Sequence, residues 1–399
     1  MYAVALECSR CNWTGELTMG YTCPCCGYSL EVKYDYNAID KNKIVDALEN
    51  GHGVWAYSEL LPLKKKENII TMGEGGTPLI ESNRIGKEVG VKLYLKDETR
   101  NPTLSFKDRP NTVGISVAKE LGFTDVAIAS TGNGAASLSA YAAKGGLRCH
   151  VFVPKSTPVG KVAQALYHDA EIIYSDGDYS ESFHYAVTMC EKYKWANITS
   201  TYINPYTMEG DKTIAYELFM QLHGSIPDWI VVPLGAGPML SGIWKGFNEL
   251  RLLGVTDRLP RMIGVQAEGC APIIDAFEKG RTKVTAWGKC ETIAGAIADP
   301  LKGYEEDGTR TLISIRASYG YGVKVSDDFI MEMVLKLAKE EAMFVEPASA
   351  SSVSAVYRLR DMGVIKQNES VVSILTAHGL KDTEELLNYL KKEKKGRMI

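Results

Sequence analysis

The sequence lacks long hydrophobic runs: no apolar stretch reaches the roughly 18 residues that a membrane-spanning helix requires. Its first ten residues, MYAVALECSR, contain neither the basic start nor the apolar core of a signal peptide, so we expect a cytoplasmic protein. The net charge of −4 is small for 399 residues, and it provides no general attraction to nucleic acids or anionic membranes. We therefore expect neither of these as a partner.

Low-complexity segments and internal repeats are also absent, which argues against fibrous and repeat architectures. Hydrophobic residues make up 45% and charged residues 24%, the composition of an ordinary globular protein with room for two or three domains. Beyond residue 70, short β-branched runs alternate with amphipathic stretches, and this alternation predicts βαβ units with mostly parallel sheets. The runs are VKLYLKDE, DVAIAST, CHVFVP, AEIIYSD, WIVVPLG, MIGVQAE and VVSILTAHG.

Two polar stretches invite simpler interpretations. The segment EEDGTRTL (305–312) has acidic residues at loop-like spacing without the ligand pattern of a calcium loop, so we expect a solvated turn. The C-terminal KKEKKGRM is most simply the solvated end of a helix.

The cysteines gather at the N-terminus. In a cytoplasmic protein, the nine cysteines are read first as metal ligands or buried thiols. The pairs Cys8-x-x-Cys11 and Cys23-x-x-Cys26 have the spacing of a tetrahedral zinc ribbon, and we expect structural Zn²⁺ within residues 1–35. Cys25 competes with Cys26 for the second pair, although the spacing favours Cys26. Reduced, metal-free thiols are the alternative.

The charge of the cysteine-rich region argues against a nucleic-acid module. Residues 1–50 contain four basic and seven acidic side chains, which is the wrong sign for phosphate contacts. We interpret the region as a structural or interface module.

Small or polar residues follow three of the expected strands. Ligands of open α/β sheets bind at the carboxyl ends of the strands. GAGPM (235–239) begins a helix without the Lys-Ser/Thr of an NTP-binding loop, so it suits a monoester phosphate held by backbone N–H groups. STGNG (130–134) suits a carboxylate, and TAHGLKD (376–382) follows a third strand. Together with Lys107 in NPTLSFKDRP, a candidate amine for an aldehyde, these sites predict pyridoxal phosphate acting on an amino acid.

The segments NPTLSFKDR, STGNGAASLSAYAAKGG, INPYTMEGDKT, FVEPASASS and LTAHGLKD resemble, in this order, the signature segments of the threonine synthase family. The resemblance covers essentially the whole chain. It implies a fold type II pyridoxal phosphate enzyme with two doubly wound α/β domains and an N-terminal zinc ribbon. We expect a large cofactor-binding domain from 36–105 and 200–399, a smaller α/β domain at 106–199, and a homodimer.

The resemblance also implies residue roles. Lys107 is the Schiff-base lysine, Asn133 bonds the cofactor's phenolic oxygen, and Thr376 faces the pyridine nitrogen. The substrate carboxylate is held by Ser130, Thr131, Gly132 and Asn133, and the cofactor phosphate by Gly235, Ala236, Gly237, Pro238 and Met239. A hydroxyl such as that of Thr376 donates to a neutral pyridine nitrogen but cannot hold a pyridinium. Proton transfer then falls to the Lys107 amine, with its pKa lowered by burial.

The sequence departs from the family around the leaving-group phosphate. Hydroxyl, amide and arginine donors that members usually carry are replaced at Gly134, Thr201, Tyr202, Thr207 and Met239. Each lost charge-assisted hydrogen bond is worth roughly 1.5–3 kcal/mol. Nearby lysines such as Lys161 or Lys212 offer a replacement charge from new directions.

Three functions follow from these observations. The first is a threonine synthase, converting O-phosphohomoserine and water to threonine and phosphate with a remodelled pocket. The second is a related lyase doing β-elimination, of the serine/threonine ammonia-lyase type, or β-replacement on another small amino acid. The third is a non-catalytic descendant, and the retained Lys107, Asn133 and Thr376 argue against it.

Overall fold

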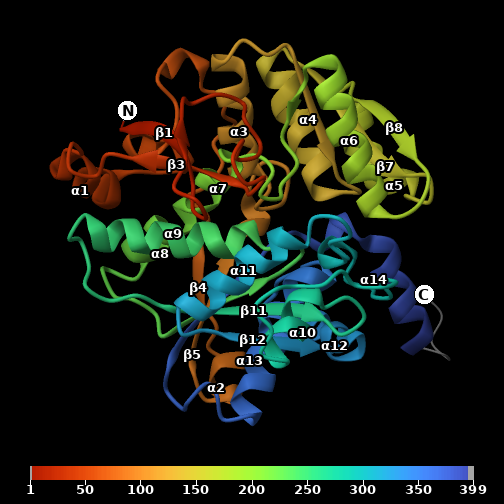
Figure 1. The fold of residues 1–399 in the computed structure, drawn as a ribbon. Helices are drawn as coiled ribbons and strands as arrows, with labels where there is room; N and C mark the ends of the chain where they lie inside the picture. The colour runs from red at the N-terminus through yellow and green to blue at the C-terminus, as the bar shows by residue number, and fades with distance from the viewer. Residues whose placement is uncertain (1, 394–399) are drawn as a thin grey trace.

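The computed structural model describes residues 2–393, so most of the basic KKEKKGRM tail lies outside the described residues. Figure 1 shows one α/β unit with α4, α5 and α6 at the upper right and a larger one with β4, β5, β11 and β12 below. None of the described helices is both long and apolar enough to cross a membrane.

The larger sheet has six strands in the order β12-β11-β10-β13-β5-β4, parallel except for β4. Its strands are β4 (Leu79–Glu81), β5 (Lys92–Asp97), β10 (Trp229–Pro233), β11 (Arg261–Ala267), β12 (Tyr321–Val325) and β13 (Ser370–Leu375). Alternate residues of the central strands enter two separate cores: Ile230 and Val232 enter one, Trp229 and Val231 the other. Burial on both faces requires the near-continuous β-branched runs seen in the sequence.

Helices cover both faces of this sheet. They are α2 (Ile85–Val89), α8 (Thr213–Gln221), α9 (Pro238–Leu252), α10 (Pro272–Glu278), α11 (Glu305–Ala317), α12 (Asp327–Glu340) and α13 (Pro347–Asp361). The last described helix, α14 (Thr383–Glu393), follows the short helical turn η5 (Gly379–Lys381). The other 3₁₀ segments are η1 (Val54–Leu60), η2 (Lys66–Asn68), η3 (Glu98–Arg100) and η4 (Gly295–Ile297).

The smaller sheet has four parallel strands in the order β8-β7-β6-β9. These are β6 (Asp125–Ala129), β7 (Arg148–Pro154), β8 (Glu171–Ser175) and β9 (Ala196–Asn197), with α3 (Asp108–Glu120), α4 (Asn133–Gly145), α5 (Val159–Tyr167) and α6 (Tyr179–Tyr193). The short α7 (Thr207–Asp211) leads back to the larger unit and packs on α3 and α9. All seven runs expected to be strands form strands in these two sheets.

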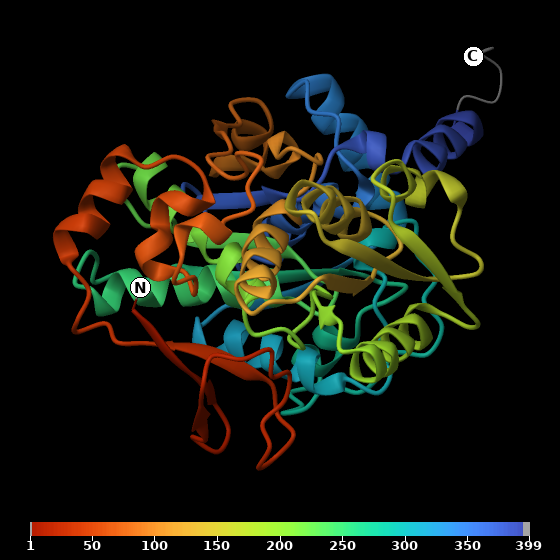
Figure 2. The same cartoon turned by 90° about the horizontal axis from the view of Figure 1, so that it is seen from above.

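The N-terminal sheet is antiparallel, in the order β2-β1-β3, and precedes α1 (Lys41–Asn50). It consists of β1 (Ala3–Cys8), β2 (Thr14–Gly15) and β3 (Leu30–Tyr34), which Figure 2 shows along one side of the molecule. Polar contacts attach β3 to helices of the larger body. Tyr34 Oη donates to Glu209 Oε2 at 2.7 Å, Lys245 Nζ donates to the Val32 carbonyl at 3.1 Å, and Glu31 pairs with Arg310 at 2.5 Å.

One expectation from the sequence is wrong. EEDGTRTL is not a solvated turn but the first turns of α11, in which Gly308 and Thr309 are buried. Its acidic residues lie in the first turn, where the positive end of the helix dipole favours negative charge. The spacing of the acidic residues did not reveal the helix, because the sequence of a helix start rich in acidic residues resembles that of a polar loop.

Candidate active site

Lys107 lies immediately before α3, in a loop fixed against the end of β13. The Phe106 N–H donates to the Thr376 carbonyl at 2.9 Å, and the His378 N–H donates to the Leu104 carbonyl at 3.1 Å. These bonds place Lys107 beside Thr376 although the two are 269 positions apart in the sequence. Both residues line the same cavity.

The two residues after Lys107 anchor this loop through buried side chains. Asp108, fully buried, accepts hydrogen bonds from the Thr103 N–H at 2.7 Å and the Ser137 hydroxyl at 2.6 Å, and burial raises its pKa to about 6. Arg109 is also fully buried and forms ion pairs with Glu98 at 2.7 Å and Glu217 at 2.6 Å. The sequence KDR therefore combines one side chain facing the cavity with two internal anchors.

A cavity opens where the strands of both parallel sheets end, with an empty space of about 1160 Å³ including its mouth. That space accommodates a cofactor together with a small substrate. All the expected cofactor and carboxylate residues line it: Lys107, Ser130, Thr131, Gly132, Asn133, Gly235, Ala236, Gly237, Pro238, Met239 and Thr376. The fold thus gathers four distant motifs around one hollow.

The GAGPM loop has the geometry of an anion cradle. Gly237 has φ of 94°, and a Cβ there would lie 2.4 Å from the Thr311 side chain, so only glycine fits. Pro238 is the first residue of α9, and no described side chain caps this helix start. The Thr311 hydroxyl binds the Ala236 carbonyl at 2.6 Å from behind. Unpaired N–H groups at the helix start are suited to a phosphate.

The amine of Lys107 lies 4.6 Å from the centre of the Phe106 ring. Burial lowers the pKa of this amine, and the nearby acidic groups Asp211, Asp299 and Glu346 oppose that shift. A lysine whose ammonium form is disfavoured gives up its proton more readily near neutral pH, as both attack on an aldehyde and proton abstraction require.

Glu346 connects the two residues expected to meet the cofactor ring, and the sequence reasoning gave it no role. The Asn133 amide donates to one of its carboxylate oxygens at 2.9 Å, and the Thr376 hydroxyl donates to the other at 3.3 Å. Burial raises its pKa to about 7. The available signal was a lone charge before Pro347 in the otherwise small and apolar segment FVEPASASS.

Asp299 is a second cavity carboxyl that the sequence did not single out. It accepts hydrogen bonds from the Tyr304 hydroxyl at 2.6 Å and the Leu301 N–H at 3.1 Å, and burial raises its pKa to about 6. Asp299 lies between Ala298 and Pro300 in a loop. This local sequence does not distinguish a cavity carboxyl from an ordinary aspartate in a turn.

The positions expected around a leaving group separate into two sets. Gly134, Thr201 and Met239 line the cavity. Tyr202 lies behind the GAGPM loop, where its hydroxyl is 2.6 Å from Ser241 Oγ and 2.8 Å from Thr311 Oγ1. Thr207 is buried, and its hydroxyl donates to the Asn204 carbonyl at 3.1 Å. Tyr202 and Thr207 therefore support the surrounding structure.

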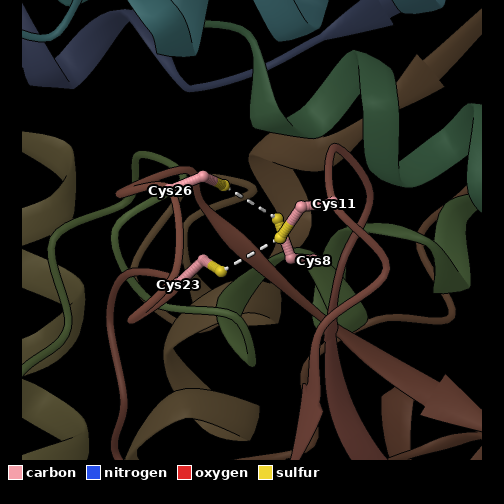
Figure 3. A group of neighbouring side chains, drawn as sticks. All are labelled: Cys8, Cys11, Cys23 and Cys26. Carbon is pink, nitrogen blue, oxygen red and sulfur yellow. Dashed lines mark hydrogen bonds between the residues drawn. The ribbon is translucent and has the colours of Figure 1, made fainter.

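The four expected metal-ligating cysteines converge in the N-terminal sheet. The sulfur atoms of Cys8, Cys11, Cys23 and Cys26 all lie within 4.8 Å of one another. Figure 3 shows the four side chains pointing toward a common centre. Tetrahedral zinc with Zn–S bonds of about 2.3 Å holds its sulfurs about 3.8 Å apart, so the cluster fits Zn²⁺ after a small contraction. Cys25 is exposed and outside the cluster.

Comparisons with known proteins agree with this geometry. Residues 70–377 match the model of the pyridoxal-phosphate dependent enzyme family. The threonine synthase of Methanocaldococcus jannaschii is 42% identical over 95% of this chain and 93% of that protein. The threonine synthase of Methanosarcina acetivorans is 42% identical over 92% and 89%. The processed form of threonine deaminase isoform 2 from Solanum lycopersicum shares the fold, with a TM-score of 0.68, 20% identity and coverage of 89% and 93%.

The cavity, the order of its motifs and the extent of these matches lead to one assignment. The chain belongs to the threonine synthase family of pyridoxal-phosphate dependent enzymes.

Proposed function

We propose that this enzyme converts O-phosphohomoserine and water to threonine and phosphate. The observation that carries the proposal is the 42% identity to curated threonine synthases along almost the entire chain. The cavity supports it, because it combines an anion cradle, a buried lysine and a separate group of small polar residues.

The cavity residues fit pyridoxal phosphate. The N–H groups at the start of α9 would hold its phosphate, Asn133 and Thr376 would meet its ring, and Lys107 would hold its aldehyde carbon covalently. When bound, the cofactor supplies an electron sink that stabilises negative charge on the substrate carbons next to the amino group.

The protein's own part is to position the substrate and to move protons. Ser130, Thr131 and Gly132, with Asn133 at the start of α4, would hold the α-carboxylate through N–H and hydroxyl groups. The Lys107 amine would take a proton from Cα and then one from Cβ, and the electron pair left at Cβ would expel phosphate from Cγ. Protons would then return to Cγ and Cα, and water would add its hydroxyl group at Cβ. One base suffices because these carbons are adjacent.

The test is turnover of O-phosphohomoserine by the purified holoenzyme, following threonine and phosphate together. We expect equal amounts of both products and a kcat/KM of about 10⁴ M⁻¹s⁻¹ or more, the usual range for an enzyme on its own substrate. Release of keto acid and ammonia from serine or threonine at a higher kcat/KM would contradict the proposal.

That outcome corresponds to the second candidate, a lyase acting on another small amino acid. One observation favours it: Gly134 and Met239, at the cavity wall, provide no side-chain hydrogen-bond donor for a phosphate. The substrate screen therefore includes serine, threonine and a β-substituted alanine.

We also propose that Cys8, Cys11, Cys23 and Cys26 bind one structural zinc ion. Changing Cys8 to alanine is expected to lower the zinc content and loosen the N-terminal sheet while cofactor binding persists, because the cluster lies outside the cavity. Metal analysis by mass spectrometry measures this, with Cys25→Ala as the matched control that retains zinc. Full zinc content in Cys8→Ala would show that the cluster is not the site.

The remaining proposals concern organisation. The division into 1–35, 36–105 with 200–399, and 106–199 is supported by the three sheets, each formed within one of these parts. A cytoplasmic homodimer remains our proposal, which size measurement in solution and fractionation would test.

A further inference from the structure

We propose that Lys161 and Lys381 form the site for the substrate's leaving-group phosphate at the mouth of the cavity. The inference rests on the proposed function for the identity of the ligand. The charges, positions and partners of the residues around the cavity mouth carry the site itself.

The cavity offers few positive charges. Among the described residues that line it, the cationic side chains are Lys107, Lys161 and Lys381. Lys107 is committed to the cofactor and to proton transfer. A phosphate dianion moved out of water requires charged partners, since hydroxyls alone compensate its desolvation poorly. Lys161 and Lys381 are therefore the available pair.

Lys212, the other lysine suggested by the sequence, is excluded by its position. Its side chain is 0% exposed, and its amine lies 2.5 Å from Glu209 and 2.9 Å from Glu249. The Tyr34 ring covers it at 4.1 Å. Two carboxylates already compensate this charge inside the protein, and Lys212 is not among the described residues that line the cavity.

Lys161 extends from the first turn of α5 across the cavity mouth. Its amine lies 3.4 Å from where a Cβ on Gly295 would be, so it reaches η4 on the opposite wall. The side chain is 29% exposed, and its partner is Asp382, 3.2 Å away. This position leaves one side of the ammonium group open to a ligand.

Lys381 approaches the same mouth from η5, five residues after Thr376. Its amine donates to the side-chain amide oxygen of Gln164 on α5. Burial lowers the pKa of Lys381, which the nearby carboxylates Asp108 and Glu346 oppose. A bound dianion would favour the charged form of this amine, so binding and protonation would reinforce each other.

The local charges suit a dianion. The mouth carries two ammonium groups and the buried Asp382 carboxylate, and burial raises the pKa of that carboxyl. When a phosphate binds between the amines and Asp382 takes up a proton, two positive charges face two negative ones. The α-carboxylate has its own place at residues 130–133, so the two substrate anions occupy different walls.

The experiment compares Lys161→Gln, Lys381→Gln and the double variant with Lys155→Gln. Lys155 is a matched control because it lies outside the cavity lining, 64% exposed and paired with Asp176. Binding of inorganic phosphate to each holoenzyme is measured by calorimetry, and binding of L-threonine by the change in cofactor absorbance. Steady-state rates with O-phosphohomoserine are measured in parallel.

We expect each cavity variant to weaken phosphate binding roughly 10- to 100-fold, as loss of a charge-assisted hydrogen bond does. The KM for O-phosphohomoserine should rise in step, while L-threonine binding changes less than threefold. Lys155→Gln should behave as wild type. Unchanged phosphate binding in the double variant, or equal weakening of phosphate and L-threonine, would overturn the assignment.

The result also separates the two proposals. Wild-type enzyme that binds phosphate through these lysines but does not turn over O-phosphohomoserine would retain the anion site and refute the proposed reaction. Wild-type enzyme that turns it over, with cavity variants equally active, would retain the reaction and refute the site. Absence of phosphate binding to the wild-type holoenzyme would refute the site as well.

Discussion

Replacing Lys107 with alanine is expected to lower kcat/KM by about 10⁴-fold or more, because in the proposed mechanism one amine provides both the covalent attachment and the proton transfer. The loss should appear mainly in kcat, since the cavity residues 130–133, our proposed site for the α-carboxylate, remain in place. Rates with O-phosphohomoserine at saturating cofactor measure it. The fold should persist, because Lys107 faces the cavity and Asp108 and Arg109 provide the internal anchors.

The matched control is Lys119→Ala, on the exposed side of α3, which should leave activity unchanged. Borohydride reduction of the wild-type holoenzyme followed by peptide mapping should find the cofactor on Lys107. A label on Lys96 or Lys119 would show that the assignment is wrong.

A second large effect is expected for Arg109→Ala, this time on stability. Arg109, Lys96, Glu98 and Glu217 form a buried network with balanced charge, and each side chain is at most 1% exposed. Removing the guanidinium leaves two buried carboxylates facing one ammonium group. We expect the free energy of unfolding to fall by about 3–5 kcal/mol, the usual result of breaking a buried pair.

Urea denaturation at fixed cofactor concentration measures this change. Lys33→Ala is the comparison, because its pair with Glu7 at 2.8 Å is exposed and should contribute less than about 1 kcal/mol. A similar loss in both variants would indicate that the buried network contributes no more than a surface pair.

Much of the architecture was predictable from local pattern. Parallel strands buried on both faces must be apolar throughout, so the seven β-branched runs were visible in the sequence. Strand β12, YGVKV, was missed because glycine and lysine interrupt the apolar pattern, although Gly322 and Val323 are buried. The two-residue β9 is too short to carry a pattern at all.

Site residues were predictable where a single short motif contains both the functional residue and the local residues that position it. Lys107 and GAGPM have this property, and the structure places both at the cavity; their roles stay predictions. The choice between Lys161 and Lys212 required the fold, because burial of Lys212 depends on Glu249, 37 residues away on another helix. Glu346 was missed for the same reason: its partners come from α4 and from the end of β13.

The hydrogen bonds of Glu346 have a consequence for cofactor affinity. They fix the Asn133 and Thr376 side chains through contacts of the protein alone. Ordering a mobile side chain on binding costs about 0.5–1.5 kcal/mol. For these two residues the loss of rotational entropy occurs during folding. In their proposed role at the cofactor ring, more of the interaction energy would then remain as binding free energy. The site is preorganised: the entropic cost of ordering these side chains lowers the free energy of unfolding and not the affinity for the cofactor.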